Sequence, residues 1–387
     1  TLPLSLANEM VENVLGTLAL PFGLAPGFQI DGKEVQVPMV TEEPSVIAAA
    51  SYASKLINMA GGTTTVQEKR EMIGEIAIVK SPLTLEEVKT KLDEQKESLF
   101  TIANNAHPSI VKRGGGIREI WVEEKSTDKE RFYIFYVSVD TKEAMGANML
   151  NTILEALVSP IEALTGGEST MAILSNLATN SIVTARCVLS PRILDTRTTK
   201  GEDVIDRIVL ASEFSKADPY RATTHNKGIM NGIDSVVIAT GNDWRAIEAG
   251  VHAYASLSGK YQPLTSWTKD EAGNLVGTIT LPLPVGTVGG SISIHPGAQF
   301  GHELLGHPSA IELAGIIASI GLAQNLAAVR ALVTDGIQKG HMRLQAKSLG
   351  LAVGATEEEL PLLMNLLAKA PHLNQETAKS LLEELRK

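Results

Sequence analysis

Residues 221–243 of this 387-residue chain hold its densest group of side chains that could do chemistry. The apolar run at 235–240 within this segment predicts a buried strand between two polar loops. Lys227 and Asp243 would flank that strand, and they could converge at its two ends or across a fold-back. A lysine ammonium that a carboxylate holds in a site without water can stabilise an oxyanion.

The same pair has a plainer interpretation. A lysine and an aspartate picked from a sequence most often form an exposed ion pair, which contributes little to stability. The surroundings favour a site instead, because exposed faces rarely need many directional hydrogen-bonding groups beside several glycines. Five further polar side chains crowd the segment: Arg221, His225, Asn226, Asn231 and Asn242.

Two other motifs suggest chemistry, but their spacing argues against it. Residues 302–307 read His-Glu-Leu-Leu-Gly-His. On a helix these two histidines would lie about 140° apart, instead of the roughly 40° of the H-E-x-x-H zinc site. The glycines at 284–290 are not followed by Lys-Ser or Lys-Thr, which excludes a P-loop. We therefore expect no metal.

Composition bounds the class of protein. A chain of this length predicts two or more domains, and 44% hydrophobic with 20% charged residues is typical of a soluble globular protein. The single cysteine, Cys187, excludes an internal disulfide framework, and its apolar neighbours predict a buried, unreactive thiol in a reducing compartment. Neither a signal peptide nor a membrane-length apolar run is present, so we expect a cytoplasmic protein without a membrane partner.

Net charge bears on the partners. The formal charge of −10 argues against nonspecific nucleic-acid binding. The strand at 131–136 is aromatic enough to suggest an RNA-recognition domain, but it lacks glycine and follows the acidic residues Glu123, Glu124 and Asp128. Its aromatic side chains are more simply explained by sheet packing. We expect no nucleic-acid partner.

The elements that must position these side chains include an inserted module. Thr84 and Glu87 form a capping box at the start of an amphipathic helix. The module reads as strand, helix, two strands, helix and strand, at 74–79, 85–103, 117–123, 131–140, 144–164 and 171–174. This order predicts a ferredoxin-like domain, with two helices on one face of an antiparallel sheet.

The flanking segments predict a larger domain. Its helices are expected at 44–60, 203–215 and 309–333. The alanines at 48–50 let another helix approach closely, so the first of these helices is expected to be central and buried. From Gly336 onward, short helices separated by glycine and proline predict a small mobile subdomain. The predicted fold is α+β, with a large domain at residues 1–71 and 179–336, a small domain at 72–178 and a C-terminal helical subdomain at 337–387.

Five blocks of residues point to one family. RATTHNKGIMNGID at 221–234, continued by ATGNDWRA at 239–246, resembles the class II, soluble type of 3-hydroxy-3-methylglutaryl-CoA (HMG-CoA) reductase. Four further blocks occur in the family's order: ENVLG at 12–16, EEPS at 42–45, EAMGAN at 143–148 and GIQKGHM at 336–342. The likeness covers nearly the whole chain, and we expect the sequence before Thr1 to lack only the family's opening helical segment.

The resemblance implies a reaction and assigns catalytic roles. The thioester of HMG-CoA would be reduced to mevalonate and free coenzyme A in two hydride steps of the mevalonate pathway. Lys227 would stabilise the carbonyl oxygen, with Asp243 orienting its ammonium. His341 would protonate the departing thiolate. Glu43, kept protonated by burial or by Asp243, would protonate the aldehyde oxygen; its neighbour Glu42 is the weaker candidate.

The resemblance also implies how the substrate binds. Arg221 and Ser45 would hold the substrate carboxylate, with Asn231 and Gln324 as hydrogen-bond partners. Ser45 could equally be a first-turn helix residue, and Gln324 a polar group in helix packing.

The cofactor follows from the reaction, since no side chain donates hydride. The chain has no G-x-G-x-x-G after a strand, so a Rossmann domain is not expected. Residues 143–148 instead lie where a strand turns into a helix, whose free N–H groups can bind a diphosphate. The family has Asp at the position of Glu143, which leaves the contact of Glu143 open. The resemblance assigns the cofactor to Glu143, Met145, Gly146, Ala147, Asn148 and Asn176.

A second glycine turn, at 114–116, bears on the choice of cofactor. NAD-using members of the family carry an aspartate shortly before it, where this chain has Ala106 and His107. A carboxylate would repel a 2′-phosphate, whereas His107, Lys112 or Arg113 could neutralise one. We expect NADPH, with NADH as the alternative.

The resemblance further implies a homodimer with a shared active site, in which the cofactor module of one chain meets the substrate domain of its partner. Residues 12–16 belong to an element that the family uses at this boundary, and a higher oligomer stays open. HMG-CoA and coenzyme A are the expected small-molecule partners. The alternative is a non-catalytic protein on the same scaffold that binds coenzyme A or a nucleotide.

Overall fold

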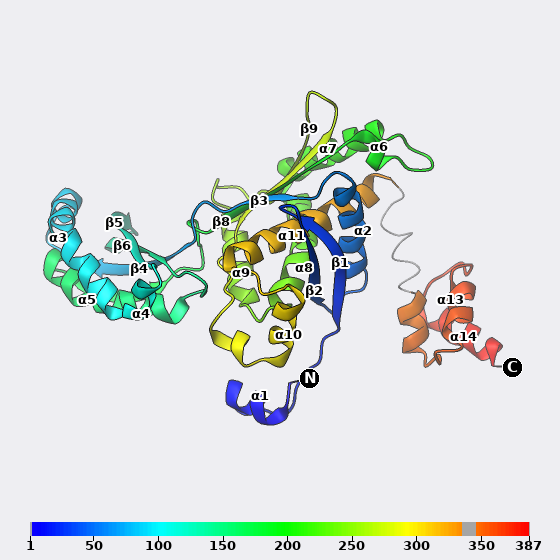
Figure 1. The fold of residues 1–387 in the computed structure, drawn as a ribbon, viewed down its shortest axis with the longest axis horizontal. Coiled ribbons are helices and arrows are strands. Elements are labelled where there is room, and N and C mark those ends of the chain that lie inside the picture. The colour runs from blue at the N-terminus through cyan, green and yellow to red at the C-terminus, as the bar shows by residue number, and fades with distance from the viewer. Residues whose placement is uncertain (1, 335–345, 387) are drawn as a thin grey trace.

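The computed structural model describes residues 2–334 and 346–386. The fold is mixed α+β and has three parts: a small unit, a large domain and a C-terminal group of helices (Figure 1). Helix α1 (Leu4–Met10) lies at the edge of the large domain, beside the N-terminus.

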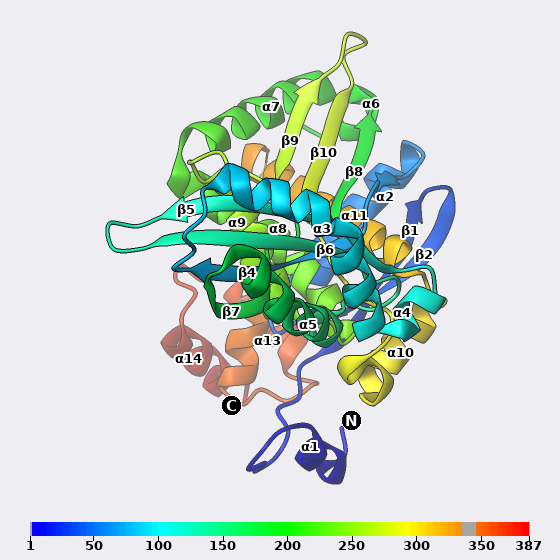
Figure 2. The same ribbon diagram turned by 90° about the vertical axis from the view of Figure 1, so that its left-hand side faces the viewer.

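The small unit is a four-stranded sheet covered by helices. Its elements are β4 (Glu71–Val79), α3 (Leu85–Ala106), α4 (Pro108–Lys112), β5 (Gly116–Ser126), β6 (Arg131–Asp140), α5 (Ala147–Thr165) and β7 (Glu168–Leu174). The strands pair antiparallel in the order β5-β6-β4-β7. Helices α3 and α5 pack together in front of this sheet (Figure 2). The predicted capping box of Thr84 and Glu87 begins α3.

The large domain is built from two sheets and a set of helices. Its N-terminal elements are β1 (Phe22–Ile30), β2 (Lys33–Val40), α2 (Val46–Met59) and β3 (Thr64–Val66). After the small unit it continues with β8 (Ile182–Leu189), α6 (Pro191–Leu194), α7 (Gly201–Ala217), α8 (Pro219–Ala239), α9 (Trp244–Ala255), β9 (Thr265–Lys269), β10 (Leu275–Pro282), η1 (Gly290–Ser293), α10 (Pro296–Leu304) and α11 (Ala310–Val333). Strands β1 and β2 form a hairpin, and the larger sheet has the order β3-β8-β10-β9.

Helix α11 is the most deeply buried helix of the large domain. All its residues from Leu313 to Leu326 are buried, and α2, α7, α8 and the larger sheet pack around it. The predicted central helix, found as α2, instead packs one face on β1 and α11 and exposes Tyr52 and Met59. Among the described residues, α11 alone has the length and apolar character to cross a membrane, yet 67% of its most apolar stretch is buried inside the protein.

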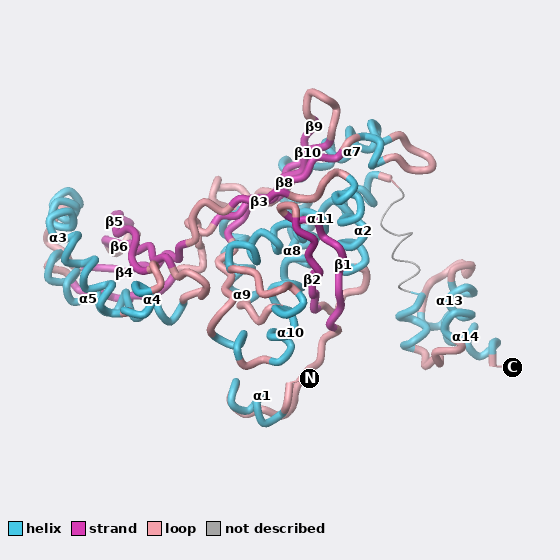
Figure 3. Tube along the Cα trace, viewed as in Figure 1, coloured by secondary structure: helices cyan, strands magenta, loops and turns pink. Residues whose placement is uncertain are grey.

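The prediction of a strand at 235–240 is wrong. Helix α8 runs without a break through residue 239, and Figure 3 draws it as helix. Asp218 begins the helix by accepting a hydrogen bond from the N–H of Arg221 at 2.7 Å. Val236 and Val237 are both fully buried, so packing on several sides outweighs the β-propensity of the run.

The C-terminal helices have a core of their own. Helices α13 (Leu360–Leu367) and α14 (Gln375–Leu385) pack together. Leu363, Leu367, Ala378 and Leu382 are buried between them. The cluster is separate from the cores of the other two parts.

Two buried groups of the large domain titrate far from their usual range. Cys187 is 2% exposed, and burial raises the pKa of its thiol to about 12, which makes it the unreactive cysteine expected from its neighbours. His225 lies 2.5 Å from Thr265 and 3.2 Å from Asn325 of the core. Burial, helped by the charge of Arg221, lowers the pKa of His225 to about 4.

This histidine should make the large domain sensitive to acid. An unfolded histidine takes up a proton near pH 6.5, whereas folded His225 stays neutral until about pH 4. The unfolded state therefore binds more protons as pH falls, and stability falls with it. Between pH 7 and 5 we expect a loss of about 2 kcal/mol from this group. The Tm of a His225→Gln variant should fall less than that of the wild type over this range; equal falls would contradict the assignment.

Candidate active site around Glu43 and Lys227

Glu43 and Lys227 meet although 184 residues separate them in sequence. The ammonium of Lys227 donates to Glu43 Oε2 at 2.6 Å, and Asn231 Nδ2 donates to Glu43 Oε1 at 3.3 Å. Lys227 and Asn231 are four residues apart on α8 and so share one face of the helix. Glu43 lies in the turn between β2 and α2, where its N–H donates to Thr41 Oγ1 at 3.1 Å. Both oxygens of one carboxylate are thus held by α8.

Ser45 lies in the same turn with an unusual backbone. It begins α2 in the left-handed region, with φ of +77°, and is the N-cap of the helix instead of a first-turn residue. Its side chain makes no capping hydrogen bond. A serine in this conformation costs about 1–2 kcal/mol. The turn therefore leaves a hydroxyl uncommitted beside Glu43 at a cost in backbone energy.

Gln324 approaches the same region from α11. The side chain is 5% exposed, and its amide oxygen has no hydrogen-bond partner among the described residues. Gly232 allows the contact, because a Cβ there would lie 3.0 Å from Gln324 Cβ. A buried polar atom without a partner is uncommon and indicates a group left for a ligand. Gln324 thus brings an acceptor without a described partner against α8 at Gly232, the residue that follows Asn231.

The pair is open to solvent in the single chain. The side chain of Lys227 is 58% exposed and that of Glu43 is 38% exposed. An ion pair of this exposure contributes little to stability. The described residues of one chain leave the pair open to water, which an oxyanion site is expected to exclude.

Asp243 and Arg221 are not brought to the pair. Helix α8 extends twelve residues beyond Lys227 to Ala239, about 18 Å of helix, before the chain turns to Asp243. Asp243 caps α9, where its Oδ1 accepts from the N–H groups of Arg245 and Ala246, each at 3.1 Å. Arg221 precedes Lys227 by six residues and so points about 120° away around the helix. The predicted convergence of Lys227 and Asp243 therefore does not occur within one chain.

The segment expected to bind the cofactor begins α5. Gly146 is the N-cap, with φ of +94° and no side-chain cap, so the first N–H groups, including those of Ala147 and Asn148, have no capping side chain. A Cβ at Gly146 would lie 2.3 Å from the Thr141 side chain, so only glycine fits. Met145 precedes this N-cap, and Asn176 follows β7, with its carbonyl against Gly250 of α9. An uncapped N-terminus of a long helix suits a diphosphate.

The basic residues of the small unit gather near this helix start. Lys112 and Arg113 end α4, and His107 begins it, with Nδ1 3.2 Å from Ser109 Oγ. The glycine turn after them packs against the backbone of Asp140. Two further cations lie here that are not among the predicted site residues, Arg118 and Lys142. Arg118 and Lys142 bind Asp140 at 2.9 Å and 3.0 Å, and Lys142 stands directly before Glu143 in sequence, which is the signal that could have found it.

Glu143 makes two side-chain contacts within the protein. Its Oε2 accepts from Thr287 Oγ1 at 3.0 Å and from the N–H of Ala310 at 2.7 Å. Both donors belong to the large domain. The remaining predicted catalytic residue, His341, lies outside the described residues.

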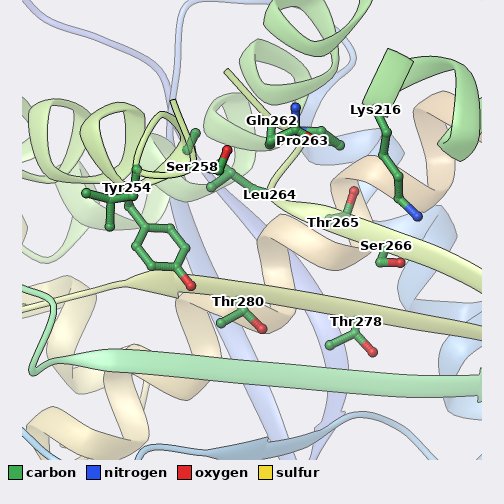
Figure 4. A pocket seen from close by; sticks show the side chains of 12 residues that line it. Lys216, Tyr254, Ser258, Gln262, Pro263, Leu264, Thr265, Ser266, Thr278 and Thr280 are labelled. Carbon is green, nitrogen blue, oxygen red and sulfur yellow. The ribbon is translucent and has the colours of Figure 1, made fainter. Parts of the chain in front are cut away.

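Two cavities lie away from Glu43 and Lys227. One of about 430 Å³ lies between α7, α9 and the edge of the larger sheet, lined by Lys216, Tyr254, Thr265 and Thr278 among others (Figure 4). None of the predicted site residues lines it. The other, of about 730 Å³, is lined by Glu143, His302 and His307 among others. His302 Nε2 lies 3.1 Å from the carbonyl of Thr240, while His307 lies beyond the end of α10.

Comparison with known proteins gives one answer throughout. A family described as Hydroxymethylglutaryl-coenzyme A reductase matches residues 1–346. A 3-hydroxy-3-methylglutaryl-coenzyme A reductase of Archaeoglobus fulgidus is 44% identical, over 100% of this chain and 87% of its own. A probable enzyme of the same name from Borreliella burgdorferi is 38% identical, over 89% and 79%. Two solved structures from Streptococcus pneumoniae are 53% identical in sequence and match 100% of this chain. The first is the class II 3-hydroxy-3-methylglutaryl-CoA reductase bound to NADPH in open conformations, with a TM-score of 0.84 over 93% of that chain. The second, of the same enzyme, has a TM-score of 0.85 over 91% of that chain.

Proposed function

The chain belongs to the hydroxymethylglutaryl-coenzyme A reductase family, and from this premise we propose that it reduces HMG-CoA to mevalonate and free coenzyme A. The reaction consumes two hydrides and two protons, and the thioester carbonyl carbon becomes the alcohol carbon. The observation that carries the proposal is the contact of Glu43 with Lys227 and Asn231, which sets an ammonium beside a carboxyl group. Mevalonate formation in the cytoplasm would supply isoprenoid synthesis.

Lys227 stabilises the oxygen that gains negative charge at each reduction. Its side chain extends from the face of α8 and is more than half exposed, so a substrate carbonyl can reach the ammonium. A fixed cation in a site that closes over the substrate stabilises a developing oxyanion without reorganisation. Asn231, on the same helix face, keeps the Glu43 carboxyl oriented while Lys227 turns to the substrate.

Glu43 supplies the proton in the second half of the reaction. The aldehyde oxygen must receive a proton when it becomes an alcohol, and Glu43 is the acid nearest to Lys227. His341 protonates the thiolate of coenzyme A as it leaves. This role belongs to the C-terminal subdomain at 337–387, which would close over the site.

The substrate carboxylate binds between α2, α8 and α11. Ser45 offers its uncommitted hydroxyl and Gln324 its unpartnered amide oxygen, which accepts the substrate hydroxyl. Asn231 joins them. Arg221 points away from this face of α8, so its guanidinium binds the carboxylate only if the substrate spans the helix or a second chain presents it.

NADPH binds the small unit. Its strand order β5-β6-β4-β7, with α3 and α5 packed together, supports a ferredoxin-like domain at residues 72–178. When bound, the cofactor supplies the hydride. The uncapped N-terminus of α5 fits a diphosphate, with Met145, Gly146, Ala147 and Asn148 around it and Asn176 nearby. His107, Lys112 and Arg113 neutralise the 2′-phosphate. The S. pneumoniae relative bound to NADPH supports this choice.

A homodimer completes the active site. In one chain Lys227 is open to solvent and Asp243 lies on the other side of a helix stretch of about 18 Å. A second copy can bring its Asp243 and its cofactor module to the Glu43–Lys227 pair of the first. This arrangement provides both the missing carboxylate and the exclusion of water.

The test is an assay of the purified protein. Mixing it with HMG-CoA and NADPH should cause substrate-dependent loss of the reduced-nicotinamide absorbance, with two NADPH oxidised per coenzyme A released. NADH should support a slower reaction. If HMG-CoA binds but neither cofactor is oxidised, the protein is the non-catalytic coenzyme A binder instead.

A further inference from the structure

The small unit and the large domain meet along a backbone seam, which we define as residues 143–145 against residues 285–288. The N–H of Thr287 donates to the carbonyl of Glu143 at 2.8 Å, and Ala144 forms a parallel bridge with Val288. Gly286 permits this approach, because a Cβ there would lie 2.6 Å from the N atom of Met145. The seam joins the start of the cofactor segment directly to the large domain.

Arg70 links the two sides of the backbone seam by hydrogen bonds. Its guanidinium is buried and donates to Thr141 at 3.0 Å, to the carbonyl of Ala144 at 2.9 Å and to the carbonyl of Val285. Burial lowers the pKa of Arg70 to about 10, against the charges of Glu143 and Asp140, which raise it. Arg70 is still protonated at neutral pH. The backbone on both sides of the seam is thus held by one cation.

The side chain of Glu143 makes further contacts with the large domain, in addition to those of the backbone seam. A single oxygen, Oε2, accepts from both Thr287 Oγ1 and the N–H of Ala310. Ala310 is the first residue of α11. The capping box of α11 pairs the N–H of Ser309 with Glu312 and the N–H of Glu312 with Ser309, so it leaves the N–H of Ala310 to Glu143.

The length of this side chain decides the contact. An aspartate at position 143 would withdraw the carboxylate by about 1.5 Å. From 2.7 and 3.0 Å, neither hydrogen bond would survive that withdrawal without a shift of the backbone. The negative charge also interacts favourably with the positive end of the 24-residue helix. The extra methylene of glutamate therefore has a structural use.

Helix α11 carries this contact toward the substrate. Fourteen residues beyond Ala310, about 21 Å along the helix, Gln324 lies against Gly232 beside the proposed carboxylate site. The helix is unbroken over this stretch, and all its residues from Leu313 to Gln324 are buried, so a shift at its N-terminus would be carried along the helix. An element that fixes the small unit on the N-terminus of α11 also fixes its orientation relative to the substrate domain.

We propose that Glu143 is a positioning residue that holds the cofactor module in register with helix α11, and that it is not a direct ligand of the cofactor. The inference rests on the proposed reductase activity. It assigns the difference from the family's aspartate to domain orientation. Hydride transfer depends steeply on the position of the donor, since a misplacement of about 1 Å costs up to 10²-fold in rate.

The experiment compares Glu143→Asp and Thr287→Val with the matched control Thr287→Ser, which keeps the hydroxyl. Glu143→Asp and Thr287→Val should each lower kcat by about 10-fold, with the KM for NADPH within about 2-fold of wild type. Thr287→Ser should behave as wild type. The double variant should be no slower than Glu143→Asp alone, because Glu143→Asp already loses the hydrogen bond that Thr287→Val removes.

Amide hydrogen exchange without ligands tests the contact apart from catalysis. The N–H of Ala310 should exchange faster in Glu143→Asp, which withdraws its acceptor, and at the wild-type rate in Thr287→Ser. A Glu143→Asp variant with a raised KM for NADPH, beside a silent Thr287→Val, would overturn the proposal and make Glu143 a cofactor ligand. Unchanged exchange of the Ala310 N–H in Glu143→Asp would overturn it too. A wild-type protein without reductase activity would instead refute the proposed function and leave the exchange result to judge the contact.

Discussion

Replacing Lys227 by methionine should lower kcat by about 10²–10³-fold, the usual cost of removing one group that stabilises an oxyanion. The fold should survive, because the side chain is 58% exposed and its pair with Glu43 adds little to stability. The KM for HMG-CoA should change far less than kcat, since the ammonium acts on charge that appears only in the transition state. The measurement is initial-rate NADPH oxidation over a range of HMG-CoA concentrations.

Lys216 provides the matched control. It is another exposed lysine on a neighbouring helix and pairs with Glu213 at 2.7 Å. Lys216→Met should keep wild-type kinetics. If Lys227→Met turned over within about 3-fold of wild type, or if Lys216→Met were equally impaired, the role of Lys227 would be lost.

Replacing Glu43 by glutamine should cost about 10²–10⁴-fold, the range typical of general acid catalysis. The amide keeps the size of the side chain and can still accept from Asn231, but it has no proton to deliver. The defect should be as large with the aldehyde intermediate as substrate, because this acid acts in the second reduction. NADPH oxidation with the aldehyde measures it directly.

The adjacent glutamate is the control for this substitution. Glu42 precedes Glu43 in the same turn, and no hydrogen bond of its carboxylate is found among the described residues. Glu42→Gln should retain nearly full activity. Loss in Glu42→Gln with retention in Glu43→Gln would exchange the two assignments.

The small unit was the part most open to prediction from sequence. Its helix at 85–103 has a capping box and apolar residues at helical spacing, and it is found as α3 with the same start. Its hairpin at β5 and β6 also follows the predicted ranges closely. In these segments local propensity, capping and hydrophobic period agree, which is the condition for a reliable inference.

Residues 235–240 could not be predicted in this way. Val236 and Val237 are adjacent and both fully buried, so burial shows no period there. A short apolar run of β-branched residues is typical of a buried strand, and only the long-range packing of α8 on α11 decides for helix. The alternation in β8 and β10, by contrast, is a usable signal that motifs alone do not reveal.

In the candidate site too, some contacts could be expected from sequence motifs and others depend on long-range packing. The contact between Glu43 and Lys227 matches the family resemblance, since both residues stand in its motifs. The separation of Lys227 from Asp243 depends on α8 being a helix, and the use of Glu143 depends on the distant N–H of Ala310. Neither the separation of Lys227 from Asp243 nor the contact of Glu143 with Ala310 can be predicted from residue type and spacing.

The most direct test of the account is a heterodimer of Lys227→Met with Asp243→Asn, made by coexpression with two different tags. Each variant alone should retain less than about 1% of wild-type activity. If Lys227 of one chain works with Asp243 of the other, the heterodimer contains one intact site of two and should show about half of wild-type activity. A heterodimer as inactive as its parents would contradict an active site shared between two chains.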